Sequence, residues 1–181
     1  MEKRALDVFG AIKNRRSVRA FTTEPVSDAE VEKLIDAARW APSAGNIQPW
    51  EFIVVREPEI KSGLCKAAGN QNFIEETPVV IVVCANALRS GQGYGQRGVN
   101  LYCLQDTAAA TQNMLLAAHA LGLATCWVGA FQEEEAREVL KLPTGVRPVA
   151  IIPIGHAAHK PRERSRRAVG EIVHHETFGR K

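Results

Sequence analysis

Two short arginine clusters are the parts of this sequence best suited to chemistry. Residues 15–19 read RRSVR, and residues 164–167 read RSRR. Guanidinium groups bind phosphate through paired hydrogen bonds and stay charged in proteins. A serine hydroxyl and neighbouring backbone N–H groups can complete such an anion site. A basic cluster of this length also fits a solvated turn, and the arginines alone leave both interpretations open.

The composition bounds the class of protein. With 181 residues, 45% hydrophobic and 24% charged, the chain fits one globular domain spanning residues 1–181. Its net charge of +3 is mild, and few aromatic residues interleave with the arginines. These features favour small anionic ligands over nucleic acid.

Targeting and redox signals indicate a cytoplasmic protein without a membrane segment. The longest apolar run, residues 79–85, is too short to cross a bilayer, and the charged N-terminus precedes no signal-peptide core. The cysteines form no Cys-x-x-Cys pair, and the histidines show no metal-ligand spacing with carboxylates, so we expect reduced thiols and no metal. His119 lies on an apolar segment and is expected to be a core or interface histidine. The four cysteines are Cys65, Cys84, Cys103 and Cys126.

Helical periodicity predicts the elements that hold the first basic cluster. Residues 5–14 form a helix that ends where the arginines begin. Ser27 and Glu30 form a capping box that opens a second helix, which must end before Pro42. Residues 101–121 form the longest helix, which is apolar nearly all round and therefore buried in the core or against another subunit. Asp106, near its start, is expected to cap or to bond backbone.

The rest of the pattern mixes strands with helices and predicts an α+β fold. Residues 86–100 are rich in Gly and Gln and are expected to form a loop. Within that loop, residues 93–98 (GYGQRG) match the dinucleotide-binding pattern, but the strand–helix–strand context is missing, so we reject a Rossmann site. Ile172 and Val173 could add an edge strand. The predicted strands are 52–55, 79–85, 124–128 and 149–154, and the further helices are 58–68 and 132–140.

Four segments, in order, resemble the FMN-dependent nitroreductase family along the whole chain. They are NRRSVRAF at 14–21, APSAGNIQPWEFIVV at 41–55, GLATCWVGAF at 122–131 and IPIGHAAHKPRERSRRAVGEIVHHETF at 152–178. The resemblance implies an α+β fold with a central mixed sheet flanked by helices. It also implies an intertwined homodimer, with FMN sites in the interface and a C-terminal arm that wraps the partner.

The resemblance assigns the arginine clusters to the flavin. Arg15 is implied to hold the phosphate together with Arg167, with Arg164 or Arg166 as a further partner. Arg19 is implied to reach the pyrimidine edge, where negative charge develops when the flavin is reduced and a fixed cation stabilises that charge. The full set in this first motif is Arg15, Arg16, Ser17 and Arg19.

Further segments match the family's flavin contacts. Residues 42–46 match a loop that approaches the flavin from the other subunit, and residues 128–130 match a turn whose backbone N–H bonds flavin N5. Gln48 and Trp50 are expected to be structural, the amide pinning the loop and the indole packing beneath it. Tyr94, Tyr102 and Phe131 fit either a substrate pocket or ordinary packing. The implied contacts are Pro42, Ser43, Ala44, Asn46, Gln71, Val128, Gly129, Ala130, Arg166 and Arg167.

The predicted function is an oxidoreductase in which flavin N5 carries the chemistry, so no side chain is predicted to be catalytic. Hydride from NAD(P)H would reach the flavin and then an electron-poor acceptor such as a nitroaromatic or quinone, in a ping-pong cycle. Three other FMN reactions stay open: enone reduction, dehalogenation and flavin cleavage. A flavin-binding or storage protein with little turnover is the alternative from another class.

Overall fold

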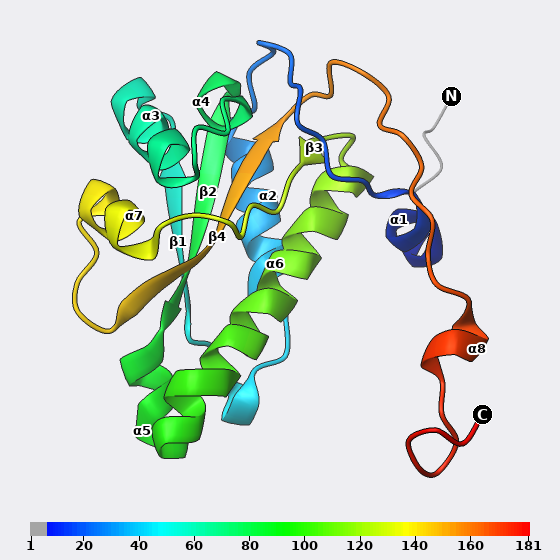
Figure 1. The fold of residues 1–181 in the computed structure, drawn as a ribbon. Helices are drawn as coiled ribbons and strands as arrows, with labels where there is room; N and C mark the ends of the chain where they lie inside the picture. The colour runs from blue at the N-terminus through cyan, green and yellow to red at the C-terminus, as the bar shows by residue number, and fades with distance from the viewer. Residues whose placement is uncertain (1–6) are drawn as a thin grey trace.

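The computed structural model of the chain describes residues 7–181 as one sheet covered by helices on both faces (Figure 1). Within this range, no helix has the length and apolar character needed to cross a membrane. The predicted first helix begins at Val8, and residues 5 and 6 of that prediction lie outside the described range.

The strands are β1 (Trp50–Val55), β2 (Val79–Asn86), β3 (Ala124–Thr125) and β4 (Val146–Gly155). The helices are α1 (Val8–Asn14), α2 (Asp28–Arg39), α3 (Pro58–Ala67), α4 (Phe73–Glu76), α5 (Ala87–Arg97), α6 (Cys103–Ala120), α7 (Glu133–Leu140) and α8 (Val169–Ile172), with short turns η1 (Ala44–Asn46) and η2 (Gly98–Tyr102).

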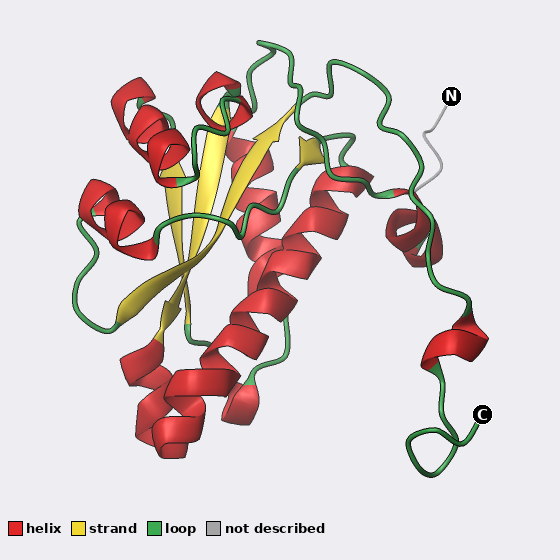
Figure 2. Cartoon of the chain, viewed as in Figure 1, coloured by secondary structure: helices red, strands yellow, loops and turns green. Residues whose placement is uncertain are grey.

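The sheet has the strand order β1-β2-β4-β3, and its ladders are antiparallel. The α+β class with flanking helices is confirmed (Figure 2). The prediction of a mixed sheet holds only for one isolated parallel bridge, between Ser17 and Thr125. That bridge ties the N-terminal basic segment to the short edge strand β3.

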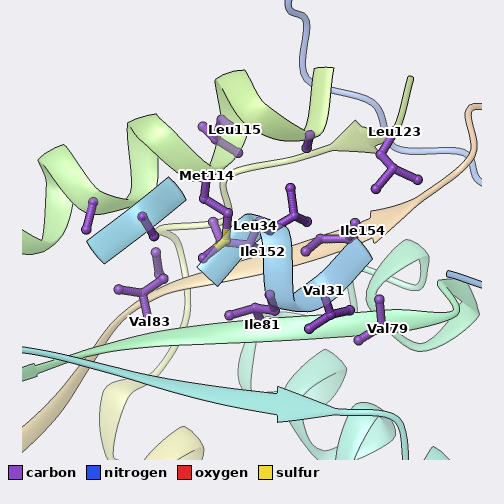
Figure 3. Packing of buried hydrophobic residues seen from close by; sticks show 14 of the residues in the cluster. Val31, Leu34, Val79, Ile81, Val83, Met114, Leu115, Leu123, Ile152 and Ile154 are labelled. Carbon is purple, nitrogen blue, oxygen red and sulfur yellow. The ribbon is translucent and has the colours of Figure 1, made fainter. Parts of the chain in front are cut away.

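Strand β2 separates two apolar cores. The first core lies between the sheet and the helices α2 and α6. It contains Val79, Ile81 and Val83 of β2, Leu34 of α2 and Met114 of α6 (Figure 3). The alternate residues of the same strand face α3 and α7 on the other side; they are Val80, Val82 and Cys84. The continuous β-branched run therefore formed a strand buried on both faces, as its sequence predicted.

The predicted capping box is confirmed and sets the start of α2. The Ser27 Oγ accepts from the Glu30 N–H, and the Glu30 carboxylate accepts from the Ser27 N–H at 2.9 Å. Helix α2 then packs along α6 on one face of the sheet (Figure 1). This packing fixes the long helix whose two ends carry the candidate site.

Two predicted elements were wrong, and a third is shorter than predicted. Residues 86–100 form a helix rather than a loop, because the Asn86 side chain caps α5 by accepting from the Arg89 N–H at 3.0 Å. Gly95 interrupts that helix with φ 52°. Ile172 and Val173 add no edge strand; Ile172 ends the exposed helix α8, in an arm that leaves the body after β4 (Figure 1). The predicted strand 124–128 is reduced to β3 and a single bridge between Val128 and Ile151.

Candidate functional site

The first basic segment is fixed against the sheet edge by its backbone. The Val18 N–H donates to the Thr125 carbonyl at 2.9 Å, and the Val18 side chain is buried. Its neighbours Ser17 and Arg19 are exposed, and Arg15 is half-buried. The short β-type pairing therefore turns one residue into the core and leaves the polar residues free to bind a ligand.

The two arginine clusters meet across one cavity of about 500 Å³. One wall is the segment 15–20, and the other is the C-terminal arm between His159 and Arg166, which follows β4. The cationic side chains that line the cavity are Arg15, Arg16, Arg19, Lys160, Arg162, Arg164 and Arg166. The structure thus brings together segments about 140 positions apart in the sequence, as the resemblance implied.

The positive charge in this cavity is largely uncompensated. Among residues 7–181, the cavity's ion pairs with acidic residues are confined to Arg16 and Glu163, at 3.5 Å. Burial lowers the pKa of Arg15 below its ordinary value, and the neighbouring charges of Arg16 and Arg166 lower it further. Cations held together without carboxylates are stabilised when an anion binds between them. The donor set therefore fits a phosphate group.

Two of the predicted arginines differ in their surroundings from the rest. Arg16 bonds the chain itself: its guanidinium donates to the carbonyls of Lys13 and Arg15, besides pairing with Glu163. Arg167 is exposed and is not among the residues that line the cavity, whereas Arg166 is. The geometry therefore points to Arg15 and Arg166 as the arginines best placed for a phosphate.

The predicted loop 42–46 has a strained backbone held by specific contacts. Gly45, Asn46 and Gln48 all have left-handed backbones, with φ of 54°, 55° and 55°. Glycine adopts such a conformation readily, whereas at Asn46 and Gln48 it persists only where surrounding contacts enforce it. The Gln48 side chain donates to Asn46 Oδ1 at 3.2 Å and Trp50 is buried, so the structural roles expected for both residues are confirmed.

Two helices anchor the same loop from outside. The Arg89 guanidinium of α5 donates to the Gln48 carbonyl at 2.9 Å, and the Tyr94 hydroxyl lies 2.7 Å from the position that a Cβ on Gly45 would take. Asp106 Oδ1 of α6 accepts from the Ala44 N–H at 3.1 Å, which confirms the expected backbone bond. Within the loop, Ser43 and Ala44 are half-buried, and Pro42 and Asn46 are exposed.

Asp106 has an unusual environment for a carboxylate. It is 7% exposed, and its second oxygen has no hydrogen-bond partner among the described residues. Burial raises the pKa of Asp106 above its ordinary value, and the Ala44 N–H opposes that shift. The loop is thus tied to the start of α6 by a carboxylate that is costly to bury.

A third predicted segment lies on the connection from β3 to α7. Val128 is buried and exchanges backbone hydrogen bonds of 3.0 Å with Ile151. Gly129 and Ala130 are exposed, and their N–H groups donate to no carbonyl within residues 7–181. The Gln71 side chain donates to the Ala130 carbonyl at 3.4 Å and to Ala68 at 2.9 Å, so it lies beside this turn.

Within one chain, the loop and the arginine cavity lie at opposite ends of α6. Asp106 holds the loop near the start of the helix, while His119 near its end lines a cavity of about 220 Å³ with Arg15 and Arg16. Thirteen positions separate these two residues, roughly 20 Å at the helical rise. Burial lowers the pKa of His119, as do Arg15 and Arg16, which fits a neutral histidine packed at this end. One chain therefore does not bring all the predicted flavin contacts together.

Several residues at these sites escaped the sequence prediction. Lys160 and Arg162 line the arginine cavity, and Arg89 anchors the strained loop. Alternation of cations from Lys160 to Arg166 was a readable signal, whereas nothing local marks Arg89. Within residues 7–181, no three His, Cys, Asp or Glu side chains gather in a way that could hold a metal ion.

Comparisons with known proteins agree on one family. The model of the nitroreductase family matches residues 12–72 and 62–156. The chain is 34% identical over 163 residues to a protein of Methanothermobacter thermautotrophicus, covering 88% of this chain and 82% of that one. It is 31% identical to the FMN reductase (NADPH) of Bacillus subtilis over 180 residues, covering 92% and 72% of the two chains. The structure of the nitroreductase NfrA1 of Bacillus subtilis superposes with a TM-score of 0.87 at 29% identity, covering 95% of this chain and 75% of that one.

Proposed function

The chain belongs to the nitroreductase family, and from this premise we propose that it is an FMN-dependent oxidoreductase that uses NAD(P)H. When bound, FMN accepts a hydride from NAD(P)H and passes it to an acceptor. The protein's task is then to bind, orient and tune the cofactor. The relatives named as FMN reductase and NADPH nitroreductase support this class of reaction.

The observation that carries the proposal is the cationic cavity between the two ends of the chain. Arg15 is half-buried beside Arg166, and neither has an acidic partner among the described residues. A phosphate held between two guanidinium groups accepts several charge-assisted hydrogen bonds and relieves their mutual repulsion. Arg15 and Arg166 would hold the FMN phosphate, and the hydroxyl of Ser17 would add a donor beside them.

The other predicted contacts take roles at the flavin ring. Arg19 is an exposed cation that lines the same cavity and would stabilise negative charge on the ring. The N–H groups of Gly129 and Ala130 are free to donate to a ring nitrogen, and Gln71 would hold their turn in place. These groups orient the ring without any side chain that must gain or lose a proton.

The complete flavin site is proposed to form between two copies of the chain. The loop 42–46 would come from the partner, because in one chain it lies at the opposite end of α6 from Arg15. Exposed apolar side chains on α1 and on the C-terminal arm supply the surface such a dimer needs. Phe9 is 73% exposed, Val169 72% and Phe178 93%.

The proposed acceptor is a flat, electron-poor compound such as a nitroaromatic or a quinone. Hydride donor and acceptor would use the same open face of the ring in turn. Enone reduction, dehalogenation and flavin cleavage by the same bound FMN are the alternatives that an acceptor screen separates.

An anaerobic spectrum with nucleotide addition tests the proposal. The purified protein should show flavin absorption that bleaches with NADH or NADPH and returns when a quinone or nitroaromatic is added. Flavin bands that no nucleotide bleaches would replace the enzyme with a flavin-storage protein. A protein that neither carries nor takes up FMN would overturn the proposal.

A further inference from the structure

The buried carboxylate of Asp106 joins the start of α6 to the loop 42–46. Its Oδ1 accepts from the Ala44 N–H at 3.1 Å, across 62 positions of sequence. Its Oδ2 is buried and has no hydrogen-bond partner among residues 7–181, and the residue as a whole is 7% exposed. A group that can accept several hydrogen bonds is therefore buried while one of its oxygens accepts none.

Packing alone does not account for a carboxylate at this position. Burial raises the pKa of Asp106 above its ordinary value, because the charged form is disfavoured away from water. An apolar side chain of similar shape would avoid that cost. Residues that oppose the stability of a fold are expected at functional sites, so the contact that Asp106 makes is the place to look for a function.

The group that Asp106 holds is the first residue of a tight turn. Ala44 begins η1, and the next two residues, Gly45 and Asn46, have left-handed backbones. The Ala44 carbonyl accepts from the Ile47 N–H at 3.1 Å, so a shift of Ala44 would be passed on through the turn. Asn46 is exposed on this turn and is a predicted flavin contact.

The far end of the same turn has anchors of its own. The Gln48 carbonyl accepts from Arg89 at 2.9 Å, and the Gln48 N–H donates to Ser43 Oγ at 3.0 Å. Neither contact involves the Ala44 N–H. Loss of the Asp106 carboxylate would therefore leave the turn attached to the protein but free to shift at Ala44.

We propose that Asp106 is a positioning residue of the flavin site, whose carboxylate fixes the Ala44 N–H and so holds Asn46 against the flavin. This inference rests on the proposed function and adds a residue outside the implied flavin contacts. In the proposed dimer, the carboxylate of one chain would act on the flavin that the arginines of the other chain bind.

The test compares Asp106→Leu, which removes the acceptor, with Asp106→Asn, which keeps an oxygen that can accept. Asn113→Leu is the matched control, because Asn113 Nδ2 also ties α6 to a distant backbone, donating to the Ala37 carbonyl at 3.2 Å. FMN would be titrated by fluorescence into the full chain of each variant. The visible circular dichroism of the bound flavin and the urea midpoint of unfolding would be recorded on the same set.

Ala44→Pro removes the same hydrogen bond from the side of the loop. Ala44 is the first residue of η1 and follows an extended Ser43, with φ −140° and ψ 153°, so the backbone is compatible with proline. Far-ultraviolet circular dichroism would check that this variant folds. If Asp106 acts through the Ala44 N–H, Asp106→Leu has nothing further to remove in the Ala44→Pro background.

We expect Asp106→Leu to weaken FMN binding about tenfold or more, since a hydrogen bond to a charged group is lost, and to alter the dichroism of the bound flavin. Asp106→Asn should stay within about threefold of wild type. Asn113→Leu should stay within about twofold even where its urea midpoint falls, and Asp106→Leu should cost less than about twofold more in the Ala44→Pro background.

Four results would overturn this role of Asp106. They are wild-type FMN affinity in Asp106→Leu, equal losses in Asp106→Leu and Asp106→Asn, an equal loss in Asn113→Leu, and a full additional loss in the Ala44→Pro background. If Ala44→Pro does not fold, the first three decide the question. A wild-type protein that binds no flavin would instead defeat the proposed function, so the two failures are distinct.

Discussion

At the scale of single residues, the adjacent Arg15 and Arg16 differ in the contacts that each makes with the rest of the protein. Arg16 donates to the carbonyls at the end of α1 and pairs with Glu163. Arg15 has no acidic partner among the described residues, and its pKa is lowered by burial and further by the nearby charges of Arg16 and Arg166. A cation already satisfied by the protein gains little from a ligand, whereas an unsatisfied one gains much.

Arg15→Gln should therefore weaken FMN binding far more than Arg16→Gln does. We expect the FMN dissociation constant to rise about tenfold or more in the first variant and less than about threefold in the second, as charged hydrogen bonds to phosphate are lost only in the first. Fluorescence titration of the apoprotein with FMN measures both. A larger loss in Arg16→Gln would reverse our assignment of the two side chains.

The buried carboxyl of Asp106 predicts a pH dependence of stability. Its pKa is raised in the folded state, so the folded protein holds this proton more tightly than the unfolded chain does. The associated stability is fully present below the ordinary pKa of aspartate and is lost as the pH rises through the folded pKa. Asp106→Asn removes this loss and keeps an oxygen that can accept from the Ala44 N–H.

We therefore expect stability to fall less between about pH 4 and pH 7 in Asp106→Asn than in wild type, with each kcal/mol of difference shifting the melting temperature by roughly 2–4 °C. The exposed Glu32→Gln controls for the loss of one negative charge. Urea unfolding at both pH values measures the change. If the free energy of unfolding falls equally between the two pH values in wild type and in Asp106→Asn, burial of this carboxyl has no energetic consequence.

At the scale of elements, the sequence predicted what local periodicity and packing determine. The β-branched run gave β2, and the Ser27 capping box gave α2. The segment 86–100 was misread because its glycines favour a loop, while tertiary contacts such as the Arg89–Glu51 ion pair hold it as a helix. The left-handed backbones of Asn46 and Gln48 could not be predicted locally either. Contacts from distant helices hold the loop around them: Asp106 accepts from the Ala44 N–H, and Arg89 donates to the Gln48 carbonyl.

For the candidate site, the sequence predicted the segments that line the arginine cavity but not every residue that lines it. Both arginine-bearing segments that the sequence motifs named line the arginine cavity, but the motifs favoured Arg167, which is not among its lining residues, over Arg166, which is. That choice depends on which side of the arm each residue occupies. The alternation of cations from Lys160 to Arg166 contains this information once the arm is known to be extended.

At the scale of the whole molecule, the chain has apolar surface where a partner would cover it. The C-terminal arm stands away from the body (Figure 1), and Val169 and Phe178 on it are exposed, as is Phe9 on α1. Residues 167–181 of this arm are almost all exposed, and a segment that buries so little surface has little reason to be ordered in a monomer. The proposed dimer accounts for both the arm and the separated halves of the flavin site.

Phe9→Asp should convert the dimer to a monomer at micromolar concentration, because it places a charge where apolar contact is proposed. FMN affinity should fall with it, since the loop 42–46 of a second chain is lost. Sedimentation velocity and flavin fluorescence measure the two effects, and Lys33→Asp serves as the control for a new surface charge. A monomeric variant that keeps wild-type FMN affinity would place the whole site in one chain.

The division of each flavin site between two chains is tested most directly by mixed dimers. One chain carries Arg15→Gln/Arg166→Gln; the other carries Gly45→Val, which puts a branched side chain at φ 54° beside the Tyr94 hydroxyl. Each variant alone should bind FMN weakly. If each site takes its arginines from one chain and its loop from the other, the mixed dimer contains one site with both defects and one intact site. Titration of the purified mixed dimer should then show one FMN bound with wild-type affinity for every two chains. Weak binding at both sites of the mixed dimer would contradict the account.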